Sequence, residues 1–487
     1  MKTGNMILVS NRLPTTVEAG AEGPVLKPSS GGLVTALRPV FKARKGYWIG
    51  WLGEVSGDEI DELLAGSAAE SACHLVSVAL TPGEREGFYT GFSNEIVWPL
   101  FHDLQSRCNF DPTYWKAYVS VNRKFAEATA RVARANAAVW VHDYHLMLVG
   151  EFLRGLGIRS RLGFFLHIPF PPLDIFEKLP WRTQILRGLF QYDVIGFQTP
   201  RDQRNFMGCV RRFLPEVEMQ RADEETRAEC EGRVTLIRSF PIGIDFEEFS
   251  SQAQQPAIAA RAAEIREEMR GRQIVLGVDR LDYTKGVPDR LRAFQHLLAT
   301  RKNLRRQLSL VQIVVPSREN IPKYRELKLE TETLISQING QFGDPGWMPI
   351  HYIHRSIERP ELVALYSAAD IALITPLKDG MNLISKEFCA AQAEERGVLI
   401  LSEFAGSAEQ LNNGAILVNP YDIGAVAEAL VAAFRMEPAE RTQRMHKLRR
   451  RVRHADVFRW CDDFCSYLEA SGDREEGRAP RQQRSTG

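Results

Sequence analysis

Residues 273–315 read QIVLGVDRLDYTKGVPDRLRAFQHLLATRKNLRRQLSLVQIVV, in which two apolar segments flank one helical segment. Residues 273–278 and 308–315 are dominated by Val, Ile and Leu, which is typical of parallel strands covered on both faces. Residues 289–304 have a helical pattern and supply the crossover that parallel strands need. The stretch therefore predicts a β–α–β unit.

The same alternation extends along the chain in both directions. Further helical patterns, such as residues 117–136, separate further apolar runs. Those runs lie at residues 6–10, 74–80, 138–142, 161–167, 193–197, 370–374, 398–401 and 415–418. The fold class is therefore predicted to be α/β with doubly wound parallel sheets, and 487 residues are enough for two such sheets.

A domain boundary is expected within FPIGIDFEEF, where the first series of strands ends. We expect an N-terminal Rossmann-like domain at residues 1–243 and a C-terminal Rossmann-like domain at 244–455. Residues 456–470 carry enough aromatic side chains to form a last helix that packs back on the N-terminal domain. Residues 471–487 are charged, without large apolar side chains, and predict a disordered tail.

Composition excludes several classes of protein. Lys and Arg sum to 62 and Asp and Glu to 61, which argues against a nucleic-acid partner. The seven cysteines form no CxxC pair and no zinc-ligand spacing, as expected of reduced thiols in the cytoplasm. The N-terminus lacks a signal peptide and no run reaches the ~20 apolar residues of a membrane span, so no membrane partner is expected.

Two cations follow the strand at residues 273–278. Arg280 and Lys285 lie in VDRLDYTKG, on a strand-to-helix loop where ligands of doubly wound sheets bind. They are close enough in sequence to converge on one pyrophosphate. The alternative is a solvated surface pair, but Leu281, Tyr283 and Gly286 indicate a packed loop.

The segment TPLKDGMNL, residues 375–383, follows the strand at 370–374 and opens a helix. Asp379 and Gly380 form a turn, and Glu387, one helical turn further on, is placed to accept hydrogen bonds from a sugar diol. The helix start would present the backbone N–H groups of Met381, Asn382 and Leu383. A plain N-cap role for Asp379 remains equally open.

Arg12 follows the opening strand, and Gly31 and Gly32 precede a helical pattern at residues 33–41. A glycine pair at a helix start lets backbone N–H groups approach a phosphate. Taken alone, the pair is better explained as a flexible turn.

Histidines and an aspartate end two buried strands of the first series. His142, Asp143 and His145 stand in VHDYHL, and His167 stands in FFLHIPFP. Their spacing fits no zinc motif, and recognition of sugar hydroxyls suits their placement better. His142 is interpreted as a satisfied core histidine.

Tyr89, Trp98 and Arg318 add a phenol, an indole N–H and a guanidinium. Taken alone, each aromatic residue is more often core than ligand. Arg318 follows a buried strand, where an arginine in a cleft needs an anionic partner; a solvated loop arginine is the equal alternative.

Nine blocks in chain order, from about residue 6 to about residue 468, are similar to those of one family. The chain resembles the trehalose-6-phosphate synthases, retaining glucosyltransferases of the GT-B architecture, in which two doubly wound Rossmann-like domains face each other across a cleft. The blocks are VSNR, SGGL, WIGWLGE, FSNEIVWPLFH, VHDYHL, FFLHIPFP, RLDYTKG, TPLKDGMNL and LSEFAGSAEQL.

The resemblance implies transfer of glucose from UDP-glucose to glucose 6-phosphate, forming α,α-trehalose 6-phosphate and UDP. It places the chain in trehalose biosynthesis and osmoprotection, as a cytoplasmic homo-oligomer, a dimer or a tetramer. UDP-glucose is then a co-substrate and no cofactor is expected.

The resemblance also implies roles for the domains and for individual residues. Residues 1–243 would form the acceptor domain and residues 244–455 the nucleotide-sugar donor domain. The catalytic residues would be Arg280, Lys285, His167 and Asp379. The donor would be bound by Gly31, Gly32, Arg280, Lys285, Asp379, Gly380, Met381, Asn382, Leu383 and Glu387. The acceptor would be bound by Arg12, Tyr89, Trp98, Asp143 and Arg318.

No metal is expected. Many glycosyltransferases neutralise the leaving diphosphate with a metal held by a DxD motif, and no DxD follows a strand here. Arg280 and Lys285 are the natural substitute, because fixed cations stabilise developing charge. The family is thought to use front-face attack, so no nucleophile is assigned. Asp279 stands where the family often has Glu, and is expected to be remote from the reacting atoms.

Two other functions compete. A glucosylglycerol-phosphate synthase would use glycerol 3-phosphate with ADP- or UDP-glucose; Arg12, Gly31, Gly32 and Arg318 favour a hexose phosphate instead. A catalytically dead regulatory subunit should have lost its charged donor residues, which are all present here. The choice among UDP, ADP and GDP stays open.

Overall fold

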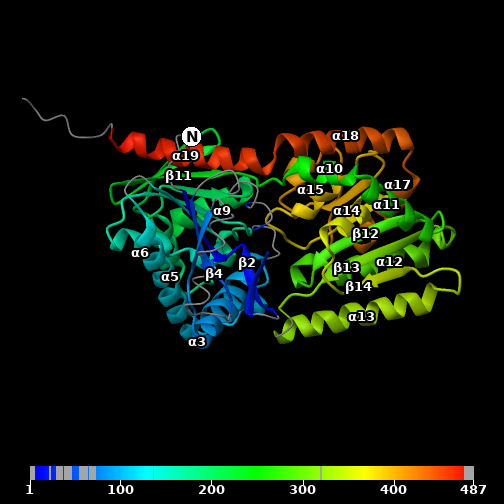
Figure 1. Ribbon diagram of the computed structural model, residues 1–487, viewed down its shortest axis with the longest axis horizontal. Coiled ribbons are helices and arrows are strands. Elements are labelled where there is room, and N and C mark those ends of the chain that lie inside the picture. Colours follow the sequence, from blue (N-terminus) through cyan, green and yellow to red (C-terminus); the bar gives the residue numbers. More distant parts are fainter. Residues whose placement is uncertain are drawn as a thin grey trace, which may run out of the picture. The chain divides into compact units, whose positions relative to one another are not determined.

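The computed structural model describes residues 6–20, 23–28, 34, 37, 46–53, 64, 73–134, 137–318 and 321–476 (Figure 1). The chain divides into two compact units, which are described separately. Unit 1 comprises Met1–Pro241 and Val457–Gly487, and unit 2 comprises Ile242–Asp456.

Unit 2 contains a six-stranded, all-parallel sheet with the strand order β14-β13-β12-β15-β16-β17. Its strands are β12 (Gln273–Arg280), β13 (Leu308–Val315), β14 (Ile350–Ile353), β15 (Ile371–Ile374), β16 (Val398–Ser402) and β17 (Ile416–Val418). The chain starts at β12 in the middle, runs outward to β14 and returns to β15 on the other side of β12. The sheet is therefore doubly wound, with its switch point between the carboxyl ends of β12 and β15.

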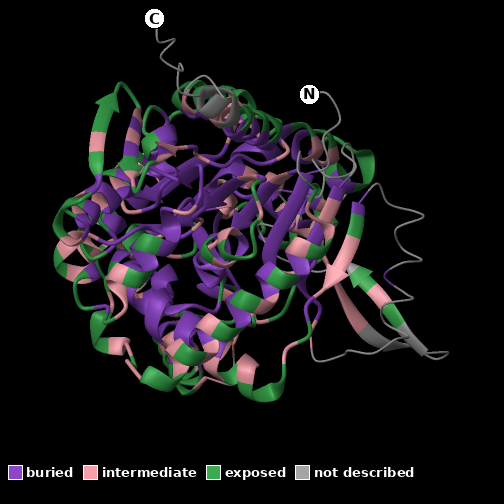
Figure 2. Ribbon diagram, turned by 90° about the vertical axis from the view of Figure 1, so that its left-hand side faces the viewer, coloured by how far each residue is buried: buried purple, intermediate pink, exposed green. Residues whose placement is uncertain are grey.

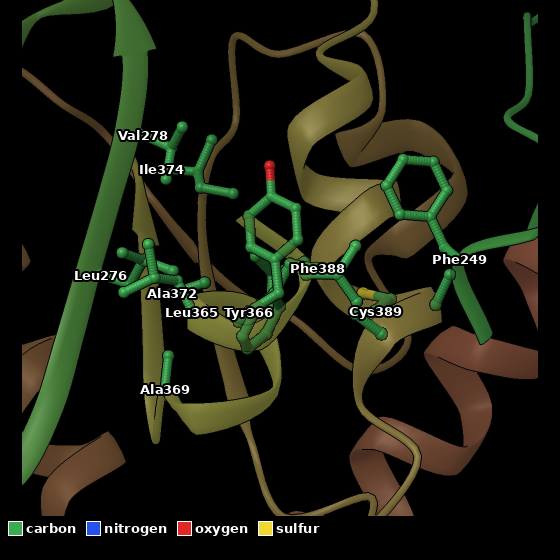
Figure 3. Packing of buried hydrophobic residues seen from close by; sticks show 14 of the residues in the cluster. Phe249, Leu276, Val278, Leu365, Tyr366, Ala369, Ala372, Ile374, Phe388 and Cys389 are labelled. Carbon is green, nitrogen blue, oxygen red and sulfur yellow. The ribbon is translucent and has the colours of Figure 1, made fainter. Parts of the chain in front are cut away.

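Helices cover both faces of this sheet (Figure 1). They are α10 (Phe246–Ala253), α11 (Pro256–Glu268), α12 (Val287–Thr300), α13 (Pro322–Phe342), α14 (Arg359–Ala368), α15 (Leu383–Ala391), α16 (Ala408–Leu411), α17 (Ile423–Arg435) and α18 (Pro438–His454), with short 3₁₀ turns η4 (Tyr283–Lys285) and η5 (Lys302–Leu304). Side chains of α10, α11, α14, α15 and α18 join one face of the strands in a single apolar cluster (Figure 3).

Unit 1 contains a nine-stranded sheet with the order β5-β4-β1-β6-β7-β8-β11-β10-β9. Its strands are β1 (Met6–Arg12), β4 (Gly46–Trp51), β5 (Cys73–Ser77), β6 (Ala138–His142), β7 (Arg161–Phe165), β8 (Val194–Phe197), β9 (Glu218–Ala222), β10 (Glu225–Cys230) and β11 (Arg233–Ser239). The strands from β5 to β11 pair in parallel, and β10 and β9 extend the sheet antiparallel. The switch point lies between β1 and β6. A separate hairpin pairs β2 (Thr15–Gly20) with β3 (Gly23–Pro28).

The helices of unit 1 come from both ends of the chain. They are α3 (Pro82–Glu84), α4 (Trp98–Phe101), α5 (Pro112–Val132), α6 (Val149–Gly155), α7 (Leu173–Phe176), α8 (Arg182–Leu189), α9 (Pro200–Phe213) and α19 (Val457–Glu476), with the π-helix η1 (Arg85–Val97) and the 3₁₀ turns η2 (Gln105–Arg107) and η3 (Tyr144–Leu146). Figure 2 shows buried residues gathered in the interior and exposed residues along outer helices. β1, β6 and β7 are buried over almost their whole length.

The last helix packs on unit 1. The ring of Phe464 stacks on Trp140 with centroids 4.4 Å apart, and Gly163 and Gly196 leave room for it. A Cβ atom on either glycine would lie within 2.9 Å of that ring. α19 extends to Glu476, beyond the expected helix end at residue 470, and the rest of the expected tail lies outside the described residues.

The predicted α/β class with two doubly wound parallel sheets is confirmed. Each strand expected from the sequence is present, with ends displaced by a few residues at most. None of the described helices is long and apolar enough to cross a membrane.

Candidate active site

An ion pair joins two loops at the switch point of unit 2. Lys285, in the loop after β12, places its Nζ 2.6 Å from Oδ2 of Asp379, in the loop after β15. The two side chains are only 11% and 15% exposed. Asn382 donates from Nδ2 to the same oxygen at 3.1 Å. Gly286 follows Lys285 at φ 62°, and a Cβ atom there would lie 2.7 Å from the carbonyl oxygen of Thr375, so glycine lets the loops approach.

The loop after β16 fixes the backbone of Asp379. The Asp379 N–H donates to the carbonyl of Phe404 at 3.2 Å, and the Gly406 N–H donates back to the carbonyl of Asp379 at 3.1 Å. A Cβ atom on Gly406 would lie 1.8 Å from the carbonyl oxygen of Gly380, so this approach requires glycine.

The N-cap of α15 is Asn382, whose Oδ1 accepts from the Ser385 N–H at 3.0 Å. An N-cap role for Asp379 is therefore wrong. In the part of the chain that the structure describes, none of the backbone N–H groups of residues 380–383 donates a hydrogen bond. These donors and Lys285 lie at the same edge of the sheet, an arrangement that favours an anion.

A buried carboxylate, Asp282, lies between the two predicted cations in the sequence. Its Oδ1 accepts from the Thr284 N–H at 3.0 Å, and its Oδ2 accepts from the Tyr324 hydroxyl at 3.3 Å. Arg318 donates from Nη1 to the same hydroxyl at 2.8 Å and lies 3.7 Å from Asp282 Oδ2. The Arg318 side chain is 10% exposed, so the solvated-loop alternative is wrong.

The charges around Asp282 keep it ionised. Burial raises its pKa, but the nearby charges of Arg318, Lys285 and Arg280 outweigh burial and lower the pKa below its usual value. Arg280, the last residue of β12, is itself exposed. Asp282 and Tyr324 were not among the site residues predicted from the sequence. Asp282 could have been predicted, because it is an acidic residue between two basic residues in RLDYTKG.

Arg290 forms hydrogen bonds with residues of both loops. It is fully buried and forms an ion pair with Asp279 of β12. Its Nε donates to Thr375 Oγ1 at 3.0 Å, and its Nη2 donates to the carbonyl of Lys285 at 3.4 Å. Asp279 is therefore linked through one side chain to the Lys285 loop.

Glu387 lies on α15 beside the same switch point and is half-buried. Its Oε2 accepts from the Tyr366 hydroxyl at 2.9 Å. Burial raises the pKa of this carboxyl.

In unit 1, Arg12 ends β1 at the second switch point. Its guanidinium carbon lies 4.3 Å from the ring centroid of Trp51 and 5.5 Å from that of Tyr89. Tyr89 stacks in turn on His145 with centroids 5.9 Å apart. These contacts hold the cation by cation–π attraction. Trp51, in the WIGWLGE block, was not among the predicted site residues.

Asp143 and His167 meet after β6 and β7. The backbone N–H of His167 donates to Asp143 Oδ1 at 3.2 Å, and Asp143 itself has φ 76°. The His167 ring lies between His142 Nδ1, 3.0 Å from its Nε2, and Gln198 Nε2, 3.3 Å from its Nδ1. Burial lowers the pKa of His167 to about 3 and that of His142 well below its usual value, so both rings are neutral.

His142 is fully buried, but its Nε2 has no hydrogen-bond partner among the described residues. The prediction of a satisfied core histidine is therefore right about burial, and right about hydrogen bonding for Nδ1 but not for Nε2. Trp98 is buried against His102 and Tyr144. Gly31 and Gly32 lie outside the described residues.

Within the described ranges, no group of three or more His, Cys, Asp or Glu side chains is placed to hold a metal ion.

Similarity to known proteins extends over nearly the whole chain. Residues 4–470 match the model of glycosyltransferase family 20. The chain is 42% identical over 478 residues to the trehalose-6-phosphate synthase of Mycolicibacterium smegmatis, covering 97% of this chain and 93% of that protein.

Two solved structures are similar throughout. One is the UDP-forming α,α-trehalose-phosphate synthase from Burkholderia xenovorans in complex with glucose-6-phosphate, with a TM-score of 0.85 and 33% identity, covering 96% of this chain and 100% of that chain. The other is the E. coli trehalose-6-phosphate structure bound with UDP-2-fluoro glucose, with a TM-score of 0.84 and 32% identity, covering 96% of this chain and 99% of that chain. The fold class is GT-B, as the resemblance implied. The chain belongs to glycosyltransferase family 20.

Proposed function

We propose that the protein is a UDP-forming α,α-trehalose-phosphate synthase, which transfers glucose from UDP-glucose to glucose 6-phosphate with retention. The observation that carries this proposal is the gathering of Lys285, Asp379 and the amides of residues 380–383 at one sheet edge, with Arg280 at the end of β12. The solved relatives that match over the same length include complexes with glucose-6-phosphate and UDP-2-fluoro glucose.

The chemistry assigned to unit 2 is stabilisation of the leaving group. The bond between the anomeric carbon and the UDP oxygen breaks, and a bond to the acceptor hydroxyl oxygen forms. The acceptor proton passes to the departing phosphate. Negative charge that develops on UDP is met by Arg280, Lys285 and the amides of residues 380–383, while Asp379 contacts the donor glucose. Such preorganised groups need no rearrangement as the bond breaks.

The remaining roles follow the resemblance. Glu387 holds the ribose of the donor. Arg12, Tyr89, Trp98, Asp143 and Arg318 bind the acceptor. The guanidinium groups suit the phosphate, since charge-assisted bonds to a phosphate are strong and directional. His167, which is neutral because of its burial, suits an uncharged sugar hydroxyl.

A screen of donor and acceptor tests the function. Purified protein is given UDP-, ADP- and GDP-glucose, each with glucose 6-phosphate or glycerol 3-phosphate, and nucleotide release is measured. UDP-glucose with glucose 6-phosphate is expected to give the highest kcat/KM. A higher value with glycerol 3-phosphate would assign the chain to glucosylglycerol-phosphate synthesis instead.

Transfer is expected to need no metal, because Arg280 and Lys285 supply the positive charge. After divalent ions are stripped, the initial rate with and without a chelator should agree. A fall of more than about tenfold on chelation, or ~1.4 kcal/mol of barrier, would contradict this expectation.

A cytoplasmic homo-oligomer, a dimer or a tetramer, completes the proposal. All seven cysteines lie within the described residues and none is in a disulfide, which suits a reducing compartment. Light scattering on the protein as it elutes from a size-exclusion column measures the number of subunits.

A further inference from the structure

A buried tyrosine reaches the carboxyl edge of the unit 2 sheet from within the apolar cluster. Figure 3 shows the ring of Tyr366 among cluster residues such as Leu365 and Phe388, with its hydroxyl pointing to the level of Ile374, the last residue of β15. Tyr366 is 1% exposed. Its polar atom therefore has a fixed position, since a tightly packed ring leaves no other rotamer free.

The hydroxyl of Tyr366 donates to Oε2 of Glu387 at 2.9 Å. Burial, and then the charge of Glu387, raise the pKa of Tyr366 well above its usual value, so the phenol remains a donor. For Glu387, burial raises the pKa, while the Tyr366 hydrogen bond and the charge of Arg359 lower it. The other oxygen, Oε1, accepts no hydrogen bond from any described residue.

We propose that Tyr366 is a positioning residue that fixes Glu387 for the ribose diol and so makes the enzyme select ribonucleotides over 2′-deoxyribonucleotides. The hydroxyl holds one carboxylate oxygen in place and leaves the other to the ligand. A carboxylate fixed in this way accepts from both hydroxyls of ribose, and deoxyribose offers only one. This inference rests on the proposed role of Glu387 in donor binding.

The test is calorimetric binding of UDP and 2′-deoxy-UDP, which needs no turnover. The wild-type protein should bind UDP at least about tenfold more tightly, because the lost contact involves a charged acceptor. Tyr366→Phe should weaken UDP binding by about two- to tenfold and weaken 2′-deoxy-UDP binding less, because deoxyribose offers Glu387 one hydroxyl instead of two; the preference for UDP should therefore fall. Tyr192→Phe is the matched control, because Tyr192 is a fully buried, hydrogen-bonded tyrosine of unit 1. It should keep the wild-type preference.

The outcomes separate the two claims. Equal binding of both nucleotides by the wild-type protein would remove Glu387 from the ribose, and with it that part of the proposed function. A wild-type preference that Tyr366→Phe retains in full would overturn the role of Tyr366 alone. Equal weakening of both nucleotides in Tyr366→Phe would also overturn it, because that is the signature of general damage to the fold.

A second variant and a pH profile guard against misfolding. Glu387→Asp withdraws the carboxylate from Tyr366 without altering the packed ring, and should lose the same preference; a retained preference would contradict the proposal. Among the described residues, the charged or titratable groups that act on Glu387 are Tyr366 and Arg359, both of α14. Loss of the tyrosine donor raises the pKa of Glu387, so UDP binding by Tyr366→Phe should fail at a higher pH on acidification than in the wild type. An unshifted profile would overturn the role of Tyr366.

Discussion

Lys285 and Asp379 connect loops that follow two neighbouring strands of unit 2. Each side chain is mostly buried, so each charge depends on the other or on a ligand. A diphosphate that approached Lys285 would meet a cation already held by Asp379 and, through the carbonyl of Lys285, by Arg290. The cation is thus placed by its surroundings, as leaving-group stabilisation requires.

Lys285→Ala is expected to lower kcat by about 10²- to 10³-fold, or ~3–4 kcal/mol, because one preorganised charge is lost as the diphosphate departs. Steady-state kinetics with varied UDP-glucose measures it. Lys302→Ala, which removes an exposed lysine of the same unit, is the control. An unchanged kcat with only a raised donor KM would mean that Lys285 binds donor without stabilising the leaving group.

Arg318→Ala is expected to raise the KM for glucose 6-phosphate by about 10- to 150-fold, because a charge-assisted contact of ~1.5–3 kcal/mol is lost. UDP binding, measured by calorimetry, should change far less. Arg325→Ala, at an exposed position of α13, is the control. An undisturbed acceptor KM in Arg318→Ala would take Arg318 out of the acceptor site.

The sequence could indicate which of these residues carry charge at strand ends, and not which of them touch. Lys285 and Asp379 are 94 positions apart, and only the pairing of β12 with β15 brings their loops together. Trp51 was not predicted as a site residue, because its contact with Arg12 also depends on the fold. A tryptophan in an aromatic strand looks like core until the structure places Arg12 over its ring.

Among the elements, α15 has an unusual start. Its N-cap, Asn382, has φ 73° and serves both the helix, through Ser385, and the site, through Asp379. A non-glycine residue in this region is uncommon, and asparagine is among the residues that tolerate it.

Asn382→Ala is expected to destabilise unit 2 by ~1–2 kcal/mol, through loss of the cap and the strain of a left-handed alanine. Asn382→Gly loses the same side-chain bonds without that strain, so it should be the more stable variant. The free energy of unfolding, from urea denaturation followed by circular dichroism, measures both. Equal stability of the two variants would mean that backbone strain plays no part.

The strands that the sequence predicted share an apolar run, and several of those that it missed lack one. β4 and β11 were missed as well, although β4 is buried over most of its length and the central residues of β11 are buried. β13 is buried on both faces and is therefore almost entirely apolar. β9 is the largely exposed edge strand and pairs antiparallel with the partly buried β10; their sequences, EMQRA and ETRAEC, have no apolar run to detect. β14 is short and carries the polar residues His351 and Tyr352, so it too lacked a signal.

At the scale of the whole molecule, unit 1 is completed by a helix from the far end of the chain. Phe464→Ala is expected to cost ~3–5 kcal/mol of the unfolding free energy of unit 1, because the cavity beside Trp140 cannot close. Chemical denaturation followed by tryptophan fluorescence measures it. Phe458→Ala, on the same helix but 39% exposed, should change stability by no more than about 0.5 kcal/mol. If Phe464→Ala also lowered the unfolding free energy by no more than about 0.5 kcal/mol, α19 would contribute little to the stability of unit 1.

The place of α19 in the chain also sets the order in which the molecule is made. β7 and β8 leave the ribosome before any part of unit 2, and the helix that covers them leaves after all of it. Domains generally fold as units while they are synthesised, the N-terminal one first. Here the nascent chain carries an uncovered apolar face around Trp140 until α19 has been synthesised. The unit made first is thus finished last, and its open face is the surface that a ribosome-bound chaperone would protect.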